Sequence, residues 1–313
     1  MPLDRRAQRL LDMLAATRGE AHAAQTPQAR RAALDALAEM ADDASEGPVE
    51  AAIAEGPDGP IDLRIHSPEA ATGALPALVF FHGGGWVAGG PRTHDGLCRR
   101  LCAASGARVI AVDYRLAPEH PFPAAFTDCL AATQWVAAHA AQLGVDPARL
   151  AVGGDSVGGG LAAAVARDAA APPLALQVLI CPILDVTFTG GSRTELAEGY
   201  FISRAAFARD LADYLPAGAA GDDPRISPLR AAAFAGLPPA LIHTAEYDPF
   251  RDEGEAYAAA LQDAELTRHP GMIHYFYAMA RAIPHARDAA TLIGAQMRAR
   301  LAASLGEAGS RLG

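Results

Sequence analysis

Short, continuous apolar runs recur along this chain, and longer alanine-rich or amphipathic stretches separate them. Runs of four to eight apolar residues bounded by turn residues are typical of strands buried on both faces. Their alternation with helical stretches predicts an α/β fold with a mostly parallel sheet and helices on both faces. The eight predicted strands are Val49 to Ala54, Ile61 to His66, Leu75 to Phe81, Arg108 to Asp113, Arg149 to Gly153, Gln177 to Ile183, Pro239 to Thr244 and Glu265 to His269.

Two regions depart from this alternation and predict a helical cap. Residues 1–45 have helical spacing, and Thr26-Pro27 forms a cap and first-turn pair. Residues 185–230 break the strand–helix pattern but hold too many aromatic and aliphatic side chains for a solvated linker. We therefore expect one α/β domain at 46–184 and 231–313, with residues 1–45 and 185–230 as its cap. An ordinary helical elaboration is the alternative for the second region.

A candidate nucleophile lies between the fifth predicted strand and the helix after it. Gly154-Asp155-Ser156-Val157-Gly158 has the form G-x-S-x-G, which places a serine on a sharp strand-to-helix turn with its hydroxyl exposed. The flanking glycines let strand and helix approach closely. Because the motif is short and the chain is rich in glycine, its interpretation depends on partners elsewhere.

A glycine loop follows the third predicted strand and supplies candidate oxyanion donors. The loop reads His82-Gly83-Gly84-Gly85-Trp86. Acyl transfer needs N–H donors aimed at the developing oxyanion, and the residue after the nucleophile, Val157, would add one more. We expect His82 to hold this loop by hydrogen bonds. A phosphate cradle is the alternative, although no Lys-Ser/Thr pair follows the glycines.

The remaining partners of the serine follow in the order Ser, acid, His that this fold uses. Asp248 follows the seventh strand and precedes a proline, which favours a loop conformation. Asp252 and Glu253 suit the first turn of the next helix. Of the three histidines after Asp248, His274 lies in a short loop before the final helix, so we predict it as the general base.

These motifs together resemble the bacterial hormone-sensitive-lipase-like esterases, family IV of the α/β-hydrolases. The matching segments are residues 82–86, 113–119, 154–159, 248–253 and 271–274. The resemblance implies Ser156 as nucleophile, Asp248 as acid, His274 as base, and an oxyanion hole of Gly84, Gly85 and Val157, with Gly83 as a further candidate. It also implies small esters with short to medium acyl chains.

Three residues beside these motifs are expected at the substrate pocket, namely Trp86, Asp155 and Tyr275. Packing beneath the cap is the alternative for Trp86, and bonding to nearby backbone is the alternative for Asp155. The family usually has alanine where this chain has Val157 and glycine where it has Tyr275. Because both residues are larger, we expect a preference for acetyl to hexanoyl esters.

Composition narrows the partners and the location of the protein. The 313 residues include 26 basic and 36 acidic side chains, a formal net charge of −10, which argues against nucleic acid and anionic membranes. The four cysteines form neither a C-x-x-C motif nor a disulfide framework, so we expect buried thiols and no metal site. No secretory signal or transmembrane run is apparent, which favours a cytoplasmic location. The oligomeric state stays open, a homodimer included.

The predicted activity is serine carboxylic-ester hydrolysis through an acyl-enzyme, with no cofactor. An acyltransferase, an amidase or a lactonase would use the same triad. A ligand-binding protein without catalysis is a different class of function, but such a protein should have lost a triad member, and this chain keeps all three.

Overall fold

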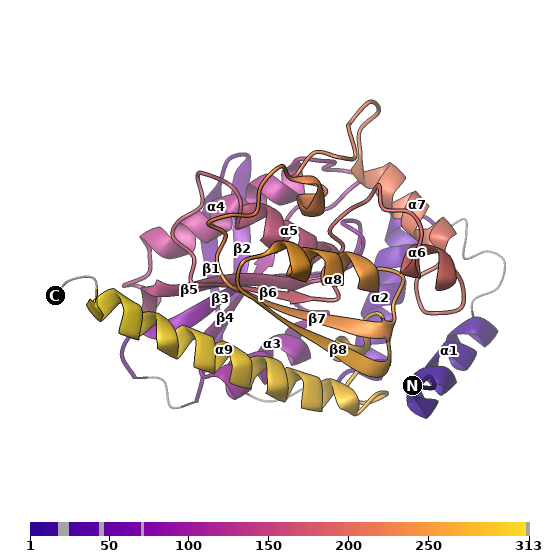
Figure 1. Ribbon diagram of the computed structural model, residues 1–313, viewed down its shortest axis with the longest axis horizontal. Coiled ribbons are helices and arrows are strands. Elements are labelled where there is room, and N and C mark those ends of the chain that lie inside the picture. The colour runs from indigo at the N-terminus through magenta and orange to yellow at the C-terminus, as the bar shows by residue number, and fades with distance from the viewer. Residues whose placement is uncertain (18–24, 44–46, 70–71, 311–313) are drawn as a thin grey trace.

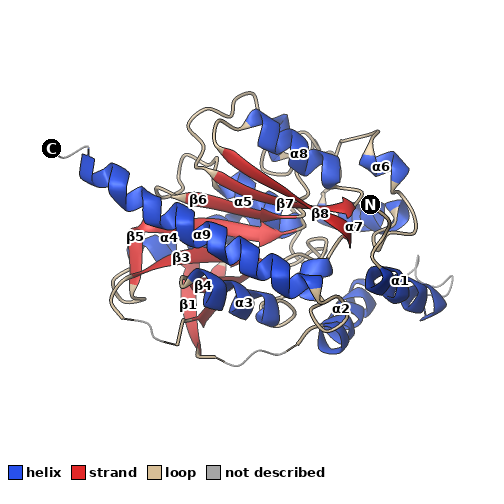
Figure 2. Cartoon of the chain, turned by 60° about the horizontal axis from the view of Figure 1, so that its bottom comes forward, coloured by secondary structure: helices blue, strands red, loops and turns tan. Residues whose placement is uncertain are grey.

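The computed structural model describes residues 1–17, 25–43, 47–69 and 72–310, and it is built around one eight-stranded sheet (Figures 1 and 2). The strand order is β1-β2-β4-β3-β5-β6-β7-β8. The pairs β1–β2 and β2–β4 are antiparallel and all other pairs are parallel, which confirms the predicted mostly parallel sheet. The strands are β1 (Val49–Gly56), β2 (Gly59–His66), β3 (Leu75–Phe81), β4 (Arg108–Asp113), β5 (Val145–Asp155), β6 (Leu176–Ile180), β7 (Ala240–Tyr247) and β8 (Ala264–Ile273).

Helices cover both faces of this sheet. In Figure 2, α3 and α9 lie in front of the sheet, and α4 and α5 lie behind it. The helices are α1 (Arg5–Thr17), α2 (Pro27–Ala41), α3 (Asp95–Ser105), α4 (Ala124–Ala138), α5 (Val157–Val165), α6 (Ser192–Glu195), α7 (Arg204–Tyr214), α8 (Arg251–Ala260) and α9 (His285–Ser310), with short 3₁₀ turns at Pro228–Arg230 and Phe276–Ala278. No helix in the described ranges is long and apolar enough to cross a membrane.

The apolar run of β3 shows why its sequence predicted a strand buried on both faces. Successive side chains of a strand point to opposite faces of the sheet. Leu78 and Phe80 belong to the core beneath α3 and α9, whereas Val79 and Phe81 belong to the core beneath α4 and α5. All four side chains are fully buried. Alternate residues of the same run therefore contribute to the two cores.

The segments outside the α/β alternation gather beyond one end of the sheet. Figure 1 shows α2, α6 and α7 together at the end where β7 and β8 finish. Helix α2 begins as predicted, because the Thr26 side chain accepts a hydrogen bond of 3.2 Å from the N–H of Ala29 and Pro27 occupies the first turn. The boundary that we place at residue 45 lies outside the described residues.

A chain of three histidines links β7, β8 and α9. His243 Nδ1 lies 3.1 Å from His269 Nε2, and His269 Nδ1 lies 3.1 Å from His285 Nε2. Burial, and after it the neighbouring histidine, lowers the pKa of His243 to about 3 and that of His269 to about 4. The folded protein therefore holds both rings neutral.

We expect this chain of histidines to make stability depend on pH below about 6.5. The unfolded chain binds protons near the ordinary histidine pKa of about 6.5, but the folded chain resists them until pH 3 to 4. Stability is thus fully present above that pKa and falls as the pH drops, by roughly 2 to 3 kcal/mol for each such ring at pH 4.5. Urea unfolding at pH 7.5 and 4.5 measures the loss.

The variant His243→Gln isolates this contribution. It should lower stability at pH 7.5 and yet reduce the further loss between pH 7.5 and 4.5. The exposed His120→Gln is the matched control and should leave that loss unchanged. Glu253 changes stability in the opposite direction, because burial raises the pKa of its carboxyl group to about 7. As the pH falls, the folded protein therefore binds this proton before the unfolded chain does. An unaltered pH dependence in His243→Gln would contradict the explanation.

Candidate active site

The carboxyl ends of four parallel strands carry the residues that the motifs single out. The glycine loop follows β3, Ser156 follows β5, Asp248 follows β7 and His274 follows β8. Because parallel strands end at one edge of the sheet, residues more than a hundred positions apart meet there. Strand β8 runs to Ile273, four residues further than its predicted end, so His274 directly follows the strand.

Ser156 occupies the sharp turn that its motif predicts. It lies between β5 and α5 with φ 54° and ψ −123°, a backbone conformation that few non-glycine residues adopt. The turn needs the glycines on either side. A Cβ at Gly154 would lie 2.3 Å from the carbonyl oxygen of Phe81, and one at Gly158 would lie 2.0 Å from the same oxygen. The chain can therefore bring β3, β5 and α5 together only with glycine at both positions.

A continuous line of hydrogen bonds joins the three candidate catalytic residues. His274 Nε2 lies 2.9 Å from Ser156 Oγ, and His274 Nδ1 lies 2.8 Å from Asp248 Oδ2. The other carboxylate oxygen of Asp248 accepts a hydrogen bond of 2.8 Å from the N–H of Phe250. Asp248 is fully buried and His274 is 2% exposed. The carboxylate is thus fixed from two sides and aimed at the imidazole.

The thiol of Cys181 lies beside this line, and sequence reasoning did not single it out. Its sulfur and one ligand atom each of Asp248 and His274 lie within 4.8 Å of one another. Burial and the nearby Asp248 raise the pKa of the thiol well above its usual value. A protonated thiol is a poor metal ligand, and both ring nitrogens of His274 already have protein partners. The three side chains together therefore suit proton transfer better than metal binding.

The glycine loop leaves two backbone N–H groups for an oxyanion. Gly84 and Gly85 have φ of 121° and 66°, which a side chain would oppose. In the described part of the chain, neither N–H donates to a protein acceptor. The N–H of Val157 opens α5, where the first residues of a helix have no intrahelical acceptor. Gly83 differs, because its N–H donates to Asp155 Oδ1 at 2.9 Å.

We expected Asp155 at the substrate pocket, but its side chain does not line the cavity. Instead, Asp155 holds the glycine loop. Besides the Gly83 bond, its Oδ2 accepts from Tyr277 at 3.0 Å and lies 3.2 Å from His94 Nε2. It is fully buried. Burial raises its pKa, but His94 and Tyr277 outweigh that effect and hold the pKa below the usual value. Neither His94 nor Tyr277 belongs to a motif, so sequence reasoning missed both.

Histidine 82 holds the same loop, as expected. Its Nδ1 lies 2.8 Å from the carbonyl oxygen of Gly83, and its ring stacks on Tyr114 at 4.2 Å between centroids. The Tyr114 hydroxyl donates to the His82 carbonyl oxygen at 2.7 Å. Burial lowers the pKa of His82 to about 3, so its ring stays neutral.

Trp86 also differs from its predicted place at the pocket. It is 3% exposed and stacks on Tyr214 of α7 at 4.4 Å between centroids. This is the packing alternative, because its ring lies beneath α7 and is absent from the cavity wall. Tyr275 does line the cavity, and its ring stacks on Phe201 at 5.6 Å. Val157 is fully buried in the core, so its larger side chain, from which we expected a preference for small acyl groups, does not reach the cavity.

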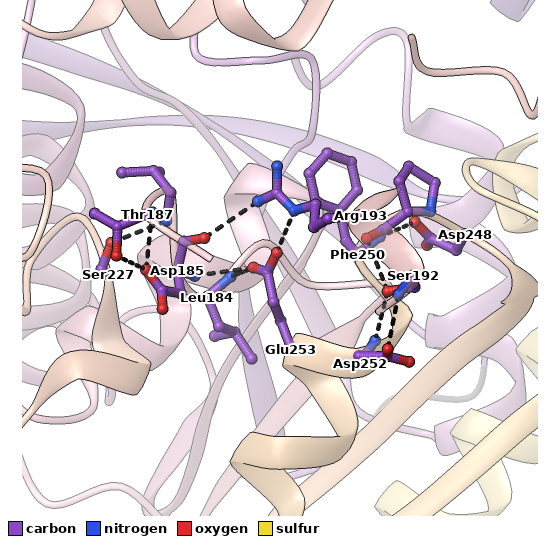
Figure 3. A network of polar contacts seen from close by, with 12 residues as sticks. Leu184, Asp185, Thr187, Ser192, Arg193, Ser227, Asp248, Phe250, Asp252 and Glu253 are labelled. Atoms are coloured by element: carbon purple, nitrogen blue, oxygen red, sulfur yellow. Dashed lines mark hydrogen bonds and ion pairs between the residues drawn. The ribbon is translucent and has the colours of Figure 1, made fainter. Parts of the chain in front are cut away.

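The segment that holds α6 is fastened to the loop of Asp248 by the network in Figure 3. Ser192 Oγ donates to the carbonyl oxygen of Pro249 at 2.9 Å, and Asp252 Oδ2 accepts from the N–H of Ser192 at 2.8 Å. Arg193 pairs with the buried Glu253 at 2.5 Å. Asp252 and Glu253 lie in the first turn of α8, as predicted, and neither bonds to His274.

The Ser156 hydroxyl faces a cavity of about 160 Å³. Its wall combines the candidate catalytic groups with residues from α2 and α7. Ile202, Phe207 and Phe250 separate it from a second cavity of about 280 Å³. The first cavity is lined by Gln25, Arg30, Ala33, Leu34, Leu37, Gly84, Gly85, Val87, Ala88, Ser156, Ile183, Phe201, Ile202, Ala206, Phe207, Arg209, Asp210, Phe250, His274 and Tyr275.

A serine, a histidine and an aspartate in hydrogen-bond contact at this edge of such a sheet define the serine hydrolases of the α/β-hydrolase fold. A family model described as alpha/beta hydrolase fold matches residues 78–278. The carboxylesterase NlhH of Mycobacterium tuberculosis is 42% identical over 246 residues, which cover 75% of this chain and 77% of that protein. The ethyl acetate hydrolase of Pseudomonas putida is 38% identical over 245 residues, 74% of this chain and 76% of that protein.

Solved structures show the same likeness over nearly the whole chain. The ester hydrolase EH1AB1 from the metagenome of Lake Arreo has a TM-score of 0.92 and 40% identity, covering 96% of this chain and 99% of that one. A thermostable esterase from Pseudomonas putida ECU1011 has a TM-score of 0.91 and 36% identity, covering 96% and 98%. The chain belongs to the hormone-sensitive-lipase-like esterases, family IV of the α/β-hydrolase superfamily.

Proposed function

We propose that this protein hydrolyses small carboxylic esters with short to medium acyl chains through an acyl-enzyme on Ser156. The observation that carries the proposal is the line Asp248–His274–Ser156, which opens on a cavity beside Gly84 and Gly85. The named relatives are ester hydrolases, and no observation favours the acyltransferase, amidase or lactonase alternatives.

The proposed reaction has two steps that use the same groups. His274 Nε2 takes the proton of Ser156 as Oγ attacks the ester carbonyl carbon, and Asp248 stabilises the imidazolium that forms. The N–H groups of Gly84, Gly85 and Val157 bind the oxyanion. His274 then gives its proton to the leaving alkoxide, and an acyl-enzyme remains. Water, deprotonated by His274, attacks the acyl carbon and releases the acid and free Ser156.

The size of the cavity supports small substrates. Its volume of about 160 Å³ lies below the roughly 300 to 1,000 Å³ that is usual for pockets of drug-sized ligands. Most of its wall is apolar, which suits an alkyl chain. Residues from α2 and α7 form part of its wall, which supports the division of the chain into an α/β domain and a cap.

A panel of p-nitrophenyl esters from acetyl to palmitoyl tests the function and the chain-length limit together. We expect hydrolysis with an optimum between acetyl and hexanoyl. Phe207→Ala removes part of the wall between the two cavities, so relative kcat/KM for octanoyl and decanoyl esters should rise by about ten-fold or more. The absence of hydrolysis for all esters would overturn the proposed function.

Two variants serve as controls for the effect of Phe207→Ala on the chain-length optimum. Phe188→Ala changes a side chain that lines only the second cavity, so it should leave the optimum unchanged. Val157→Ala should also leave the optimum unchanged, because the Val157 side chain lies in the core. If Val157→Ala extended the range of accepted acyl-chain lengths while Phe207→Ala did not, the limit on chain length would lie beside the nucleophile and not at this wall.

A further inference from the structure

The end of the cavity formed by α2 and α7 is polar, in contrast to its other walls. Arg30 of α2 pairs through its two terminal nitrogens with Asp210 Oδ1 and Asp213 Oδ2 of α7. Arg30, Arg209 and Asp210 line the cavity, as does Gln25, but Asp213 does not. The catalytic groups used above do not account for this cluster.

Several polar atoms of the cluster have no partner among the described residues. The Arg30 side chain is 8% exposed, yet its Nε makes no hydrogen bond, and neither does the buried Gln25 Oε1. Nothing in the described part of the chain donates to Asp210 Oδ2. Buried polar groups are almost always hydrogen-bonded, so the unpartnered Arg30 Nε and Gln25 Oε1 indicate a polar ligand group, and the Asp210 carboxylate, 22% exposed, is open to the same ligand.

Asp210 Oδ2 lies against the glycine loop and therefore close to the reacting ester. A Cβ built on Gly85 would lie 2.4 Å from this oxygen. Burial raises the pKa of Asp210 to about 6 despite Arg30, so the group is a carboxylate at pH 7.5. A hydrogen-bond donor on the substrate could thus reach Asp210 without leaving the cavity that Ser156 faces.

The charges and the donor pattern identify the kind of group. Arg30 pairs with both Asp210 and Asp213, and Arg209 also lowers the pKa of Asp210, so positive side chains already lie beside the carboxylates. Arg30 Nε can only donate, whereas Asp210 Oδ2 and Gln25 Oε1 can only accept. A hydroxyl group both donates and accepts, so it can satisfy both kinds of atom.

We propose that the preferred substrates are esters with a hydroxyl group on one arm, which Asp210 and Arg30 bind at the α2–α7 end of the cavity. This inference rests on the proposed ester hydrolysis and adds the substrate class. Asp210 acts here as a specificity-determining residue. The hydroxyl can belong to the alcohol arm or to the acyl arm, and the experiment distinguishes the two.

Two pairs of esters in which hydroxyl replaces methyl test the proposal at pH 7.5. For the alcohol arm, 2-hydroxyethyl butanoate is compared with propyl butanoate. For the acyl arm, methyl 3-hydroxybutanoate is compared with methyl 3-methylbutanoate. Release of acid in a pH-stat gives kcat/KM, and each value is divided by the rate of alkaline hydrolysis. We expect the wild type to favour the hydroxyl ester in one pair.

Asp210→Ala should reduce that preference about ten-fold or more, because a hydrogen bond to a charged group is lost. Asp213→Ala is the matched control: it removes the other ion pair of Arg30 outside the cavity and should keep the preference. If Asp210→Ala does not fold, Asp210→Asn keeps the volume and should reduce the preference less, by about five-fold.

The outcomes separate this inference from the proposed function. The inference would be overturned if the wild type and Asp210→Ala had the same preference for the hydroxyl ester, or if Asp213→Ala lost as much of that preference as Asp210→Ala. The cluster would then only connect α2 to α7. Hydrolysis of propyl butanoate and methyl 3-methylbutanoate, the two esters without a hydroxyl group, would still be observed in that case. Loss of hydrolysis for all four esters in the wild type would overturn the proposed function and the inference together.

Discussion

Ser156→Ala is expected to fold like the wild type and to lose ester hydrolysis by roughly 10³-fold or more. The substitution removes the Oγ that lies 2.9 Å from His274 Nε2 and leaves the oxyanion donors in place. Since the wild type already holds a non-glycine residue at φ 54°, alanine adds no backbone strain there. Steady-state kcat with p-nitrophenyl butyrate measures the effect, and thermal unfolding verifies the fold.

A second serine provides the control for this substitution. Ser105, at the end of α3, is buried and accepts a hydrogen bond of 3.1 Å from the N–H of Ala107. Ser105→Ala should lower the unfolding temperature without a large change in kcat. A fluorophosphonate probe should label the wild type and Ser105→Ala but not Ser156→Ala. More than about a tenth of wild-type kcat in Ser156→Ala would exclude Ser156 as the nucleophile.

The central strands of the sheet could be predicted from sequence because they are apolar on both faces. β3 and β4 have the predicted bounds. β5 and β8 are longer than predicted. Their extra residues include Asp146 and Pro147 in β5 and Pro270 and Gly271 in β8, which interrupt the apolar runs, and pairing with β3 and β7 extends the strands beyond those runs.

The three candidate catalytic residues could also be predicted, because each belongs to a local motif with a backbone requirement. Ser156 needs glycines on both sides, and Asp248 is fixed in a loop by the proline after it. The groups around them could not be predicted in the same way. His94, just before α3, and Tyr277, in the turn after β8, both reach Asp155, and no local pattern marks either contact.

The errors at Trp86, Asp155 and Val157 have a common cause. Each residue is adjacent in sequence to a residue that faces the cavity. At a tight turn, neighbouring side chains point in different directions, so Asp155 and Val157 face the core on either side of Ser156. The cavity is completed by α2 and α7, which are distant in sequence, and their contribution follows only from tertiary packing.

Asp248→Asn is the second change with a large expected effect, about 10⁴-fold in kcat. The N–H of Phe250 donates to Asp248 Oδ1, so an asparagine would keep its carbonyl oxygen there and turn its amide NH₂ toward His274. Nδ1 of His274 would then have to accept a hydrogen bond. The ring proton would move to Nε2, where it prevents His274 from accepting the proton of Ser156.

The neighbouring acids distinguish this tautomer effect from a general loss of negative charge. Asp252→Asn should cost far less in kcat, because Asp252 bonds to Ser192 and not to the imidazole. Glu253→Gln should lower the unfolding temperature, since it weakens the buried pair with Arg193, while kcat changes little. If a folded Asp252→Asn lost more activity than Asp248→Asn, the acid of the triad would be Asp252, and His274 would have to turn away from its present partner to reach it.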